Sequence, residues 1–463
     1  MSILKRAAAI VGEKNVLTSS DDLLVWGCDW TKVFPVKPLA IVLPKITAEV
    51  AAIVKLCREE KVAIVPSGGR TGLAAGAVAS NGEIVLSLSR MSRIEEVDTV
   101  GMTVRCEAGV TTQQVQEAAK DAGMFFGLDL AAKGSCHVGG NIATNAGGLK
   151  FIKYGGMREQ VLGIEVVLPD GEILDMMSSL RKNNTGYDLK QMFIGAEGTL
   201  GIVTRAVLKL MPRQRNLQIA CMAVPDFTKI PKILTLANIE GVQITAFEFF
   251  TKLAHEIVLK HAAGARTPFS ELSPFYVLLE VEEGPAGTGV MEPLLEKIFE
   301  AGLITDATVG ATSAQFRELW GLRENITESI SAHGQVRKND IALPIDKLEP
   351  FIAELDEELR TAPKDIEIVL FGHIGDGNLH INYVGPKSIP KEKFQADARA
   401  VEERIFRRLP KYKGSVSAEH GIGMLKKKDL AFSRSAGEVE LMKKFKRLVD
   451  PENRMNPGKI FDL

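Results

Sequence analysis

Two short glycine-rich blocks in the second half of the chain gather residue types that bind divalent metals. The first block carries His373 and His380, and the second carries Glu419 and His420. Two imidazoles and one carboxylate make a three-ligand site that leaves coordination positions open for a substrate. We therefore predict that His373, His380 and Glu419 hold a divalent metal. His420 stands next to that site, where a general base is needed.

The first block has the pattern of a β-hairpin. Apolar, β-rich runs flank the four residues Gly375 to Asn378, which suit a short hairpin connection. In that register His373 lies directly opposite His380, with Cβ atoms about 4.5–5.5 Å apart. Asn382, two residues further along the strand, points to the same face. The alternative is a pair of structural histidines without a metal.

Length and composition limit what such a site can belong to. The 463 residues predict two or three domains. Lys and Arg number 57 against 58 Asp and Glu, so no nucleic-acid partner or polybasic membrane patch is expected. No apolar run reaches the length of a transmembrane segment, and the N-terminus lacks the pattern of a signal or transit peptide. The five scattered cysteines argue against disulfides and iron–sulfur centres and predict a reducing, cytoplasmic compartment, or the mitochondrial matrix in a eukaryote.

Strands and helices alternate through the first half of the chain, which is typical of α/β or α+β units. A helix with an apolar stripe (Val50, Ile53, Val54 and Cys57) is expected from Thr47 to Glu60, capped by Thr47 with Glu49 nearby. Residues 161–168 and the turn after them predict a hairpin. A domain boundary is expected at Met211 to Asn216, and a single helix from Ser313 to Ser331.

Three glycine-rich blocks in the first half follow or precede expected strands. They are Pro66 to Leu73, Lys133 to Gly148 and Gly195 to Val203. None has the Gly-x-Gly-x-x-Gly or phosphate-binding NTPase pattern. Successive glycines still let backbone N–H groups converge on a pyrophosphate, and small residues permit close approach to a flat ligand. Any one block alone is better explained as a tight turn, but three in order favour a ligand site.

The series of blocks resembles the flavin-binding domain of the vanillyl-alcohol-oxidase-type flavoproteins, over nearly the whole chain. The resemblance implies an α+β fold: a two-subdomain FAD-binding domain and a catalytic domain with an antiparallel sheet and flanking helices. The expected parts are an N-terminal segment (1–34), the FAD-binding domain (35–213), the substrate and metal domain (214–424) and a C-terminal segment returning to the flavin domain (425–463).

By match of motif, the resemblance implies a set of FAD contacts in the three blocks and near the C-terminus. They are Pro66, Ser67, Gly68, Gly69, Arg70, Thr71, Gly72, Leu73, Gly134, Ser135, Gly139, Gly140, Asn141, Thr144, Asn145, Gly148, Gly198, Ile202 and Asn456. Some members bind FAD covalently through a histidine in the first block, where this chain has Arg70. The flavin is therefore expected to be non-covalent, with a bond from Cys136 or His137 as a minor alternative.

Within this family the chain resembles the D-2-hydroxyacid dehydrogenases, on residues 320–327, 337–344, 372–380 and 415–423. The resemblance implies zinc on His373, His380 and Glu419, although their spacing alone also admits manganese or iron. It implies His420 as the base. The implied substrate contacts are Arg323, Thr327, Lys338 and Asn382. Arg323 and Thr327, four apart in one helix, would share a face.

The implied reaction is removal of the proton from the 2-hydroxyl and hydride transfer from C2 to flavin N5, giving a 2-oxoacid. Two cations, Arg323 and Lys338, suit a second carboxylate, so D-2-hydroxyglutarate is favoured over D-lactate, glycolate or D-malate. The chain lacks a nicotinamide fingerprint, so electrons are expected to leave to an electron-transferring flavoprotein or a quinone. A zinc hydrolase and a non-enzymatic flavin-binding protein are more distant alternatives. The oligomeric state stays open, a homodimer being one form.

Overall fold

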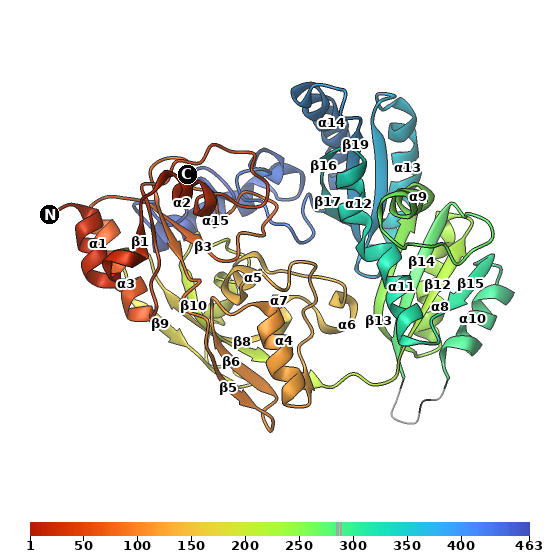
Figure 1. The fold of residues 1–463 in the computed structure, drawn as a ribbon, viewed down its shortest axis with the longest axis horizontal. Coiled ribbons are helices and arrows are strands. Elements are labelled where there is room, and N and C mark those ends of the chain that lie inside the picture. Colours follow the sequence, from red (N-terminus) through yellow and green to blue (C-terminus); the bar gives the residue numbers. More distant parts are fainter. Residues whose placement is uncertain (284–286, 288) are drawn as a thin grey trace. The chain divides into compact units, whose positions relative to one another are not determined.

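The chain folds into two compact units. The computed structural model describes residues 1–283, 287 and 289–463, and of residues 356–359 it describes the backbone alone. The first unit comprises residues 1–148, 154–213 and 419–463, and the second comprises residues 149–153 and 214–418. The C-terminal helix α15 (Ala436–Val449) thus belongs to the first unit, among the elements of its sheets (Figure 1). Each unit has its own sheet or sheets and its own hydrophobic core.

A four-stranded sheet opens the first unit. Its order is β1 (Val16–Leu17), β2 (Ala40–Val42), β4 (Ile84–Ser87) and β3 (Ile64–Ser67), with β2, β4 and β3 parallel. Helices α1 (Ile3–Val11) and α3 (Thr47–Glu59) pack on it. The apolar stripe expected for α3 is buried in this core. The Pro66 to Leu73 block therefore leaves the sheet from the end of β3.

A second sheet of the first unit is antiparallel throughout. Its order is β5 (Ile94–Asp98), β6 (Thr103–Glu107), β10 (Ile202–Lys209), β8 (Val161–Val167) and β9 (Ile173–Met176). The hairpin predicted after Val161 is thus confirmed. Apolar side chains of α4 (Thr112–Asp121) and α5 (Val138–Thr144) complete the core on this sheet.

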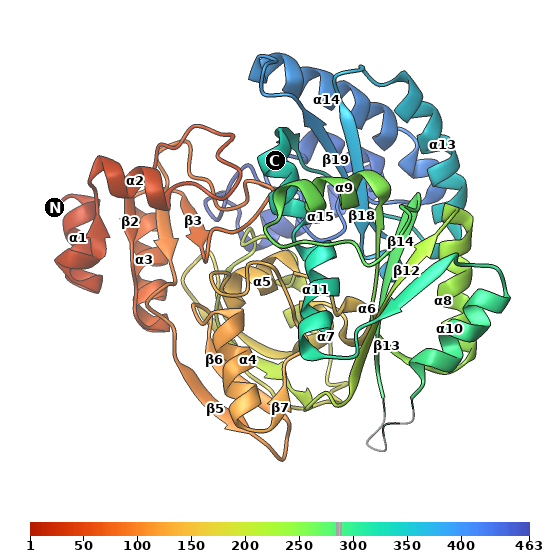
Figure 2. The ribbon, with the colours of Figure 1, turned by 45° about the vertical axis from the view of Figure 1, so that its right-hand side comes forward.

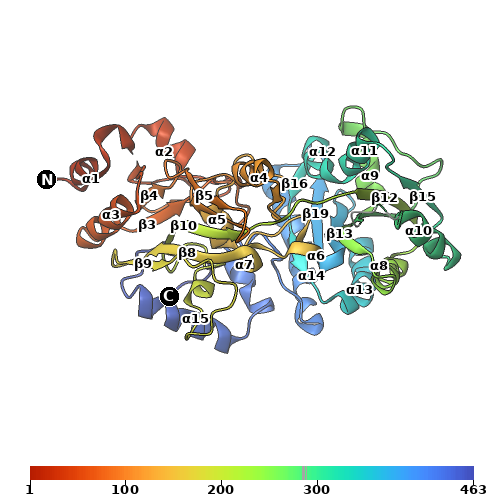
Figure 3. The ribbon, with the colours of Figure 1, turned by 90° about the horizontal axis from the view of Figure 1, so that it is seen from below.

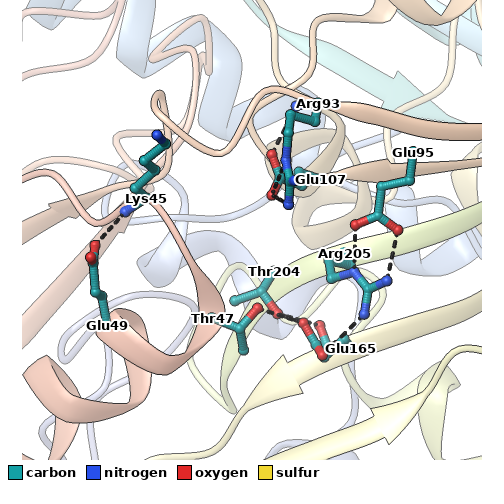
Figure 4. Close-up of polar contacts among 9 residues, drawn as sticks. All are labelled: Lys45, Thr47, Glu49, Arg93, Glu95, Glu107, Glu165, Thr204 and Arg205. Atoms are coloured by element: carbon teal, nitrogen blue, oxygen red, sulfur yellow. Dashed lines mark hydrogen bonds and ion pairs between the residues drawn. The ribbon is translucent and has the colours of Figure 1, made fainter.

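Helix α3 begins in a different way from the one predicted. Ile46 is its N-cap, and the hydroxyl of Thr47 donates to Glu165 at 2.6 Å instead of capping the helix. Glu165, on β8, also accepts from the hydroxyl of Thr204 on β10 at 2.8 Å (Figure 4). The carboxylate of Glu49 accepts from the backbone N–H of Lys45. The start of α3 is therefore tied to the antiparallel sheet.

One antiparallel sheet of eight strands forms the centre of the second unit. Its order is β15-β12-β14-β13-β18-β19-β16, with β17 also paired to β19. Their bounds are β12 Leu217–Val224, β13 Gln243–Thr251, β14 Phe275–Glu282, β15 Asp306–Val309, β16 Gln335–Arg337, β17 Asp340–Ala342, β18 Glu367–Gly372 and β19 Asn378–Gly385. The antiparallel sheet predicted for this part of the chain is confirmed.

Helices cover both faces of this sheet. On one face α9 (Lys252–His261), α11 (Ser313–Glu324) and α12 (Ile326–His333) pack against the strands. On the other lie α8 (Ile230–Ile239), α10 (Met291–Glu300), α13 (Leu348–Thr361) and α14 (Lys391–Phe406), as Figures 2 and 3 show. The single helix predicted over 313–331 is wrong, because Asn325 ends α11 and precedes α12. Among the described residues, no helix combines the length and the apolar character needed to cross a bilayer.

Candidate functional site

The histidine hairpin has a different register from the predicted one. Strand β18 ends at Gly372, and its Phe371, not His373, pairs with His380 on β19. His373 instead precedes a single 3-10 turn, and the connection closes through Gly377 in the left-handed conformation (φ 84°). A side chain at Gly377 would collide with the carbonyl of Leu343. The predicted pairing of His373 with His380 is therefore wrong, because His373 and Ile374, which were assigned to the first strand, belong to the turn.

The two imidazoles nevertheless meet. Their ring centroids lie 5.3 Å apart at an interplanar angle of 79°. Ligand atoms of His373, His380 and Glu419 all lie within 4.8 Å of one another. Glu419 follows Ala418 in the chain, and the backbone N–H of Ala418 donates to Asp340 at 2.9 Å. Asp340, on β17, is paired in register with His380 on β19. The predicted ligand set thus converges, and its chemistry suits a divalent cation.

A buried carboxylate, Glu248 on β13, joins this cluster. Its side chain is 1% exposed; Oε1 lies 2.8 Å from His373 Nδ1, and Oε2 pairs with Arg323 Nη2 at 2.8 Å. Burial by itself raises the pKa of the Glu248 carboxyl, but His373 and Arg323 outweigh burial and hold it below its ordinary value. The sequence analysis missed this residue. Its signal is a single carboxylate inside an otherwise uncharged strand that is buried over most of its length.

The four predicted substrate contacts all lie in the second unit. Arg323, 5% exposed, stacks its guanidinium over Phe371 at 4.7 Å, and its Nε has no hydrogen-bond partner among the described residues. Asn382 is 3% exposed, and within the part of the chain that the structure describes its Nδ2 also has no partner. Lys338 lies in the connection between β16 and β17, where burial lowers its pKa to about 8. Thr327 lies in the first turn of α12, so it does not share a continuous helix with Arg323.

The three glycine-rich blocks come together within the first unit. A Cβ added at Gly69 would collide with the carbonyl of Ser135, so the first two blocks touch through their backbones. The second and third blocks are joined by backbone hydrogen bonds, from Gly195 to Ile142 at 3.0 Å and from Glu197 to Ala143 at 2.7 Å. The blocks that the sequence placed far apart therefore line one region.

Asn456 brings the C-terminal segment into the same region. Its Nδ2 donates to the carbonyls of Gly76 and Glu197, at 3.0 and 2.7 Å, and its backbone N–H donates to Ile64 at 2.8 Å. A Cβ added at Gly198 would contact Pro66 at 3.2 Å and Asn456 Nδ2 at 3.8 Å.

Several polar atoms are buried around these blocks. Ser67 Oγ, His137 Nδ1, Asn456 Oδ1 and Asp29 Oδ2 are buried without a hydrogen-bond partner in the described structure. Each such atom costs about 1–3 kcal/mol if it stays unpaired. Burial lowers the pKa of His137 to about 4, so it is neutral near pH 7. A polar, extended cofactor such as FAD fits this set of donors and acceptors.

Several predicted contacts have side chains that bind within the protein. Asn141 Nδ2 donates to Thr112 Oγ1 at 2.7 Å and to Cys136 Sγ at 3.5 Å. Asn145 Oδ1 accepts from the backbone of Arg158, and Thr144 Oγ1 donates to the carbonyl of Gly140. The Cys136 thiol is turned into this buried network. Contacts of these residues with a cofactor would therefore be made by their backbones.

Glu197 fixes the loop that carries His420. Its buried carboxylate accepts from the backbone N–H groups of Ile422 at 2.7 Å and Gly423 at 2.8 Å. Burial raises the pKa of Glu197, and the two backbone hydrogen bonds counter that effect. His420 Nε2 lies 3.8 Å from Glu419 Oε1. The sequence analysis placed Glu197 in a cofactor block and missed this second contact.

Comparisons with known proteins show which families the chain is similar to. Residues 38–177 match the family model described as "FAD binding domain", and residues 213–460 match "FAD linked oxidases, C-terminal domain". The chain is 43% identical to a D-2-hydroxyglutarate dehydrogenase of Stutzerimonas stutzeri, over 99% of both chains. It is 38% identical to the mitochondrial D-2-hydroxyglutarate dehydrogenase of Bos taurus, over 96% of this chain and 81% of that protein.

Solved structures share the fold. A 4-ethylphenol oxidase from Gulosibacter chungangensis superposes with a TM-score of 0.77 at 17% identity, covering 99% of this chain and 97% of that one. A p-cresol methylhydroxylase gives a TM-score of 0.76 at 17% identity, covering 99% and 96%. The vanillyl-alcohol-oxidase-type fold predicted from the glycine blocks is thereby confirmed.

Proposed function

We infer, because this chain belongs to the FAD-linked oxidases and within them to the D-2-hydroxyglutarate dehydrogenase family, that it oxidises D-2-hydroxyglutarate to the corresponding 2-oxoacid. The observation that carries this proposal is the convergence of His373, His380 and Glu419, with His420 next in the chain. An FAD-dependent dehydrogenase needs a base for the substrate hydroxyl beside a group that makes that hydroxyl acidic, and these residues can supply both.

The chain's residues divide the work. Bound FAD supplies an acceptor for the hydride that leaves C2, and the residues of the three glycine-rich blocks would hold it. A divalent cation, which we propose to be zinc, lowers the pKa of a bound hydroxyl, and His373, His380 and Glu419 would hold it. His420 then accepts the hydroxyl proton through a ring nitrogen. The electrons leave to a separate acceptor, an electron-transferring flavoprotein or a quinone.

The substrate's second carboxylate would be bound by cations of the second unit. Arg323 offers its unpartnered Nε, and Lys338 offers an ammonium group. Asn382 offers an unpartnered amide Nδ2. Arg323 Nε and Asn382 Nδ2 are buried donors without a partner among the described residues, so a charged ligand would supply the hydrogen bonds that burial removed.

The direct test is anaerobic bleaching of the flavin. The purified protein is mixed without oxygen with D-2-hydroxyglutarate, D-lactate, D-malate or glycolate, and the visible flavin absorbance is followed. We expect D-2-hydroxyglutarate to bleach it at the lowest concentration. Faster bleaching by D-lactate or glycolate would move the assignment to another hydroxyacid. No bleaching by any of them, with flavin bound, would reject the dehydrogenase proposal.

Gly69→Ala is expected to prevent FAD binding. The added Cβ collides with the Ser135 carbonyl and forces the first two glycine blocks apart. We expect the purified variant to contain less than about a tenth of the wild-type flavin, since backbone donors no longer converge. The flavin-to-protein absorbance ratio measures this. Gly437→Ala is the control, because that glycine lies in α15 with open space around it. A fully loaded Gly69→Ala protein would contradict the proposed cofactor site.

Lys338→Met is expected to separate dicarboxylate from monocarboxylate substrates. Loss of a charge-assisted hydrogen bond, worth about 1.5–3 kcal/mol, should lower kcat/KM for D-2-hydroxyglutarate about 10- to 100-fold. D-lactate has no second carboxylate and should lose less than about threefold. Steady-state kinetics on both substrates measure the ratio. Equal losses would remove Lys338 from that role.

The same lysine predicts a pH dependence. Its pKa is lowered to about 8 by burial. Below that pH the ammonium is charged and can bind a carboxylate; above it the amine is neutral. We therefore expect kcat/KM for D-2-hydroxyglutarate to fall as the pH rises through about 8. In Lys338→Arg, whose guanidinium stays charged, this break should vanish. An unchanged profile would assign the titration to another group.

A further inference from the structure

We propose that Glu248 is a positioning residue that holds the metal ligand His373 and the substrate-binding Arg323 in one fixed arrangement. The inference rests on the proposed function and deepens it, because it names the group that sets the geometry between the metal ligand His373 and the guanidinium of Arg323. Glu248 was not among the site residues predicted from the sequence. One oxygen of its carboxylate contacts His373, and the other contacts Arg323.

The contact with His373 determines which ring nitrogen can bind a metal. Glu248 Oε1 lies 2.8 Å from Nδ1. A carboxylate oxygen accepts the hydrogen bond here, so Nδ1 carries the proton and is the donor. The Nε2 lone pair is then left for a cation. A carboxylate that accepts from a metal-bound imidazole fixes both its tautomer and its orientation, and such contacts are typically worth 10- to 100-fold in metal affinity.

The contact with Arg323 fixes the second anchor point. Oε2 pairs with Nη2 at 2.8 Å, and the face of the guanidinium lies over Phe371 at 4.7 Å. Phe371 is in turn the register partner of His380 on β19 and of Phe250 on β13. Arg323 is therefore held on two sides, by Glu248 on β13 and by Phe371 on β18, the strand that leads directly into His373.

The backbone at Glu248 is held by neighbouring strands on both sides. Strand β13 lies between β14 and β18, in the interior of the eight-stranded sheet, and Glu248 is paired in register with Leu278. A site held on interior strands keeps its geometry better than one on loops. The buried carboxylate of Glu248 thus sets the distance between the His373 imidazole and Arg323. That distance in turn determines how long a dicarboxylate substrate can be if it is to reach both the metal and Arg323.

Glu280 on the neighbouring strand β14 provides a matched control. It is equally buried, at 1% exposure, and it also bridges several partners: Lys150, Thr245 and Trp320. None of these is a proposed metal ligand or substrate contact. Glu280→Gln therefore reproduces the loss of a buried carboxylate from the same sheet without touching the site.

The test is zinc affinity, measured on flavin-loaded protein by competition with a chelating dye. Glutamine has a single acceptor oxygen, so in Glu248→Gln it cannot serve His373 and Arg323 together. We expect Glu248→Gln to bind zinc about 10- to 100-fold more weakly than wild type, and Glu280→Gln to match wild type. With zinc at saturation, KM for D-2-hydroxyglutarate should rise more than KM for D-lactate.

A second pair of variants keeps the test decisive if the unpaired Arg323 prevents folding. Glu248→Gln with Arg323→Met removes the buried charge, and Arg323→Met alone keeps the contact to His373. Weak zinc binding in the double variant and wild-type binding in Arg323→Met would support the proposal. Equal zinc affinity in wild type and both Glu248 variants would overturn it. If wild type itself bound no zinc, the metal part of the proposed function would fail instead.

Discussion

His420→Ala is expected to lower kcat for D-2-hydroxyglutarate by about 10²- to 10⁴-fold, the usual contribution of a positioned general base. The loop that carries His420 is held by its backbone, through the hydrogen bonds of Ile422 and Gly423 to Glu197. Removing the imidazole should therefore leave the loop in place. The first-order rate of anaerobic flavin reduction measures the effect on the chemical step.

The flavin and zinc contents of His420→Ala are the internal controls. Both should equal those of wild type, because His420 is not among the proposed metal ligands. Partial recovery of the rate by added imidazole would support its role as a base. Flavin reduction at the wild-type rate would remove His420 from the reaction.

His380→Ala is expected to remove the metal and to reduce turnover by more than about 10³-fold, since a three-ligand site loses one of its imidazoles and the hydroxyl loses its Lewis acid. Added zinc should not restore activity. Zinc content and turnover, measured on the same preparation, test this. Strand β19 keeps its backbone pairing with β17 and β18, so flavin content should be unchanged.

His333→Ala is the matched histidine control for this variant. His333 lies at the end of α12 in the same unit, where it contacts His261 and Glu367. Zinc content and turnover in His333→Ala should equal those of wild type. Turnover by zinc-free His380→Ala at the wild-type rate would contradict a metal-dependent reaction.

Local patterns predicted the elements well, because each depends on neighbours in the chain. The stripe of α3 and the hairpin of β8 and β9 follow from periodicity and turn residues. The antiparallel sheet of the second unit was implied by the family resemblance. The register of the histidine hairpin did not follow. A four-residue connection was one solution, but the connection after His373 contains a 3-10 turn, and the carbonyl of Gly377 at its end accepts a backbone hydrogen bond at 3.0 Å from Leu343, which is distant in sequence.

Side-chain partners that lie far apart in sequence explain the other misses. Thr47 binds Glu165 in preference to its own helix, although a local cap was available. Glu197 binds the loop after His420, and Glu248 binds His373. Residue type was sufficient to predict the metal ligands, since the chain has only 7 histidines and two of them lie in one short block. It could not identify the carboxylates that orient them, because glutamates are common and their partners are set by the tertiary fold.

The central claim is that the cation held by His373, His380 and Glu419 is needed for transfer of the C2 hydrogen to FAD. Its most direct test is anaerobic stopped-flow reduction of the bound flavin by D-2-hydroxyglutarate, in zinc-loaded and chelator-treated wild type with equal flavin content. We predict rapid bleaching of the zinc-loaded protein, at least about 10²-fold slower bleaching without metal, and recovery when zinc is returned. Equal rates in the two preparations would contradict the account.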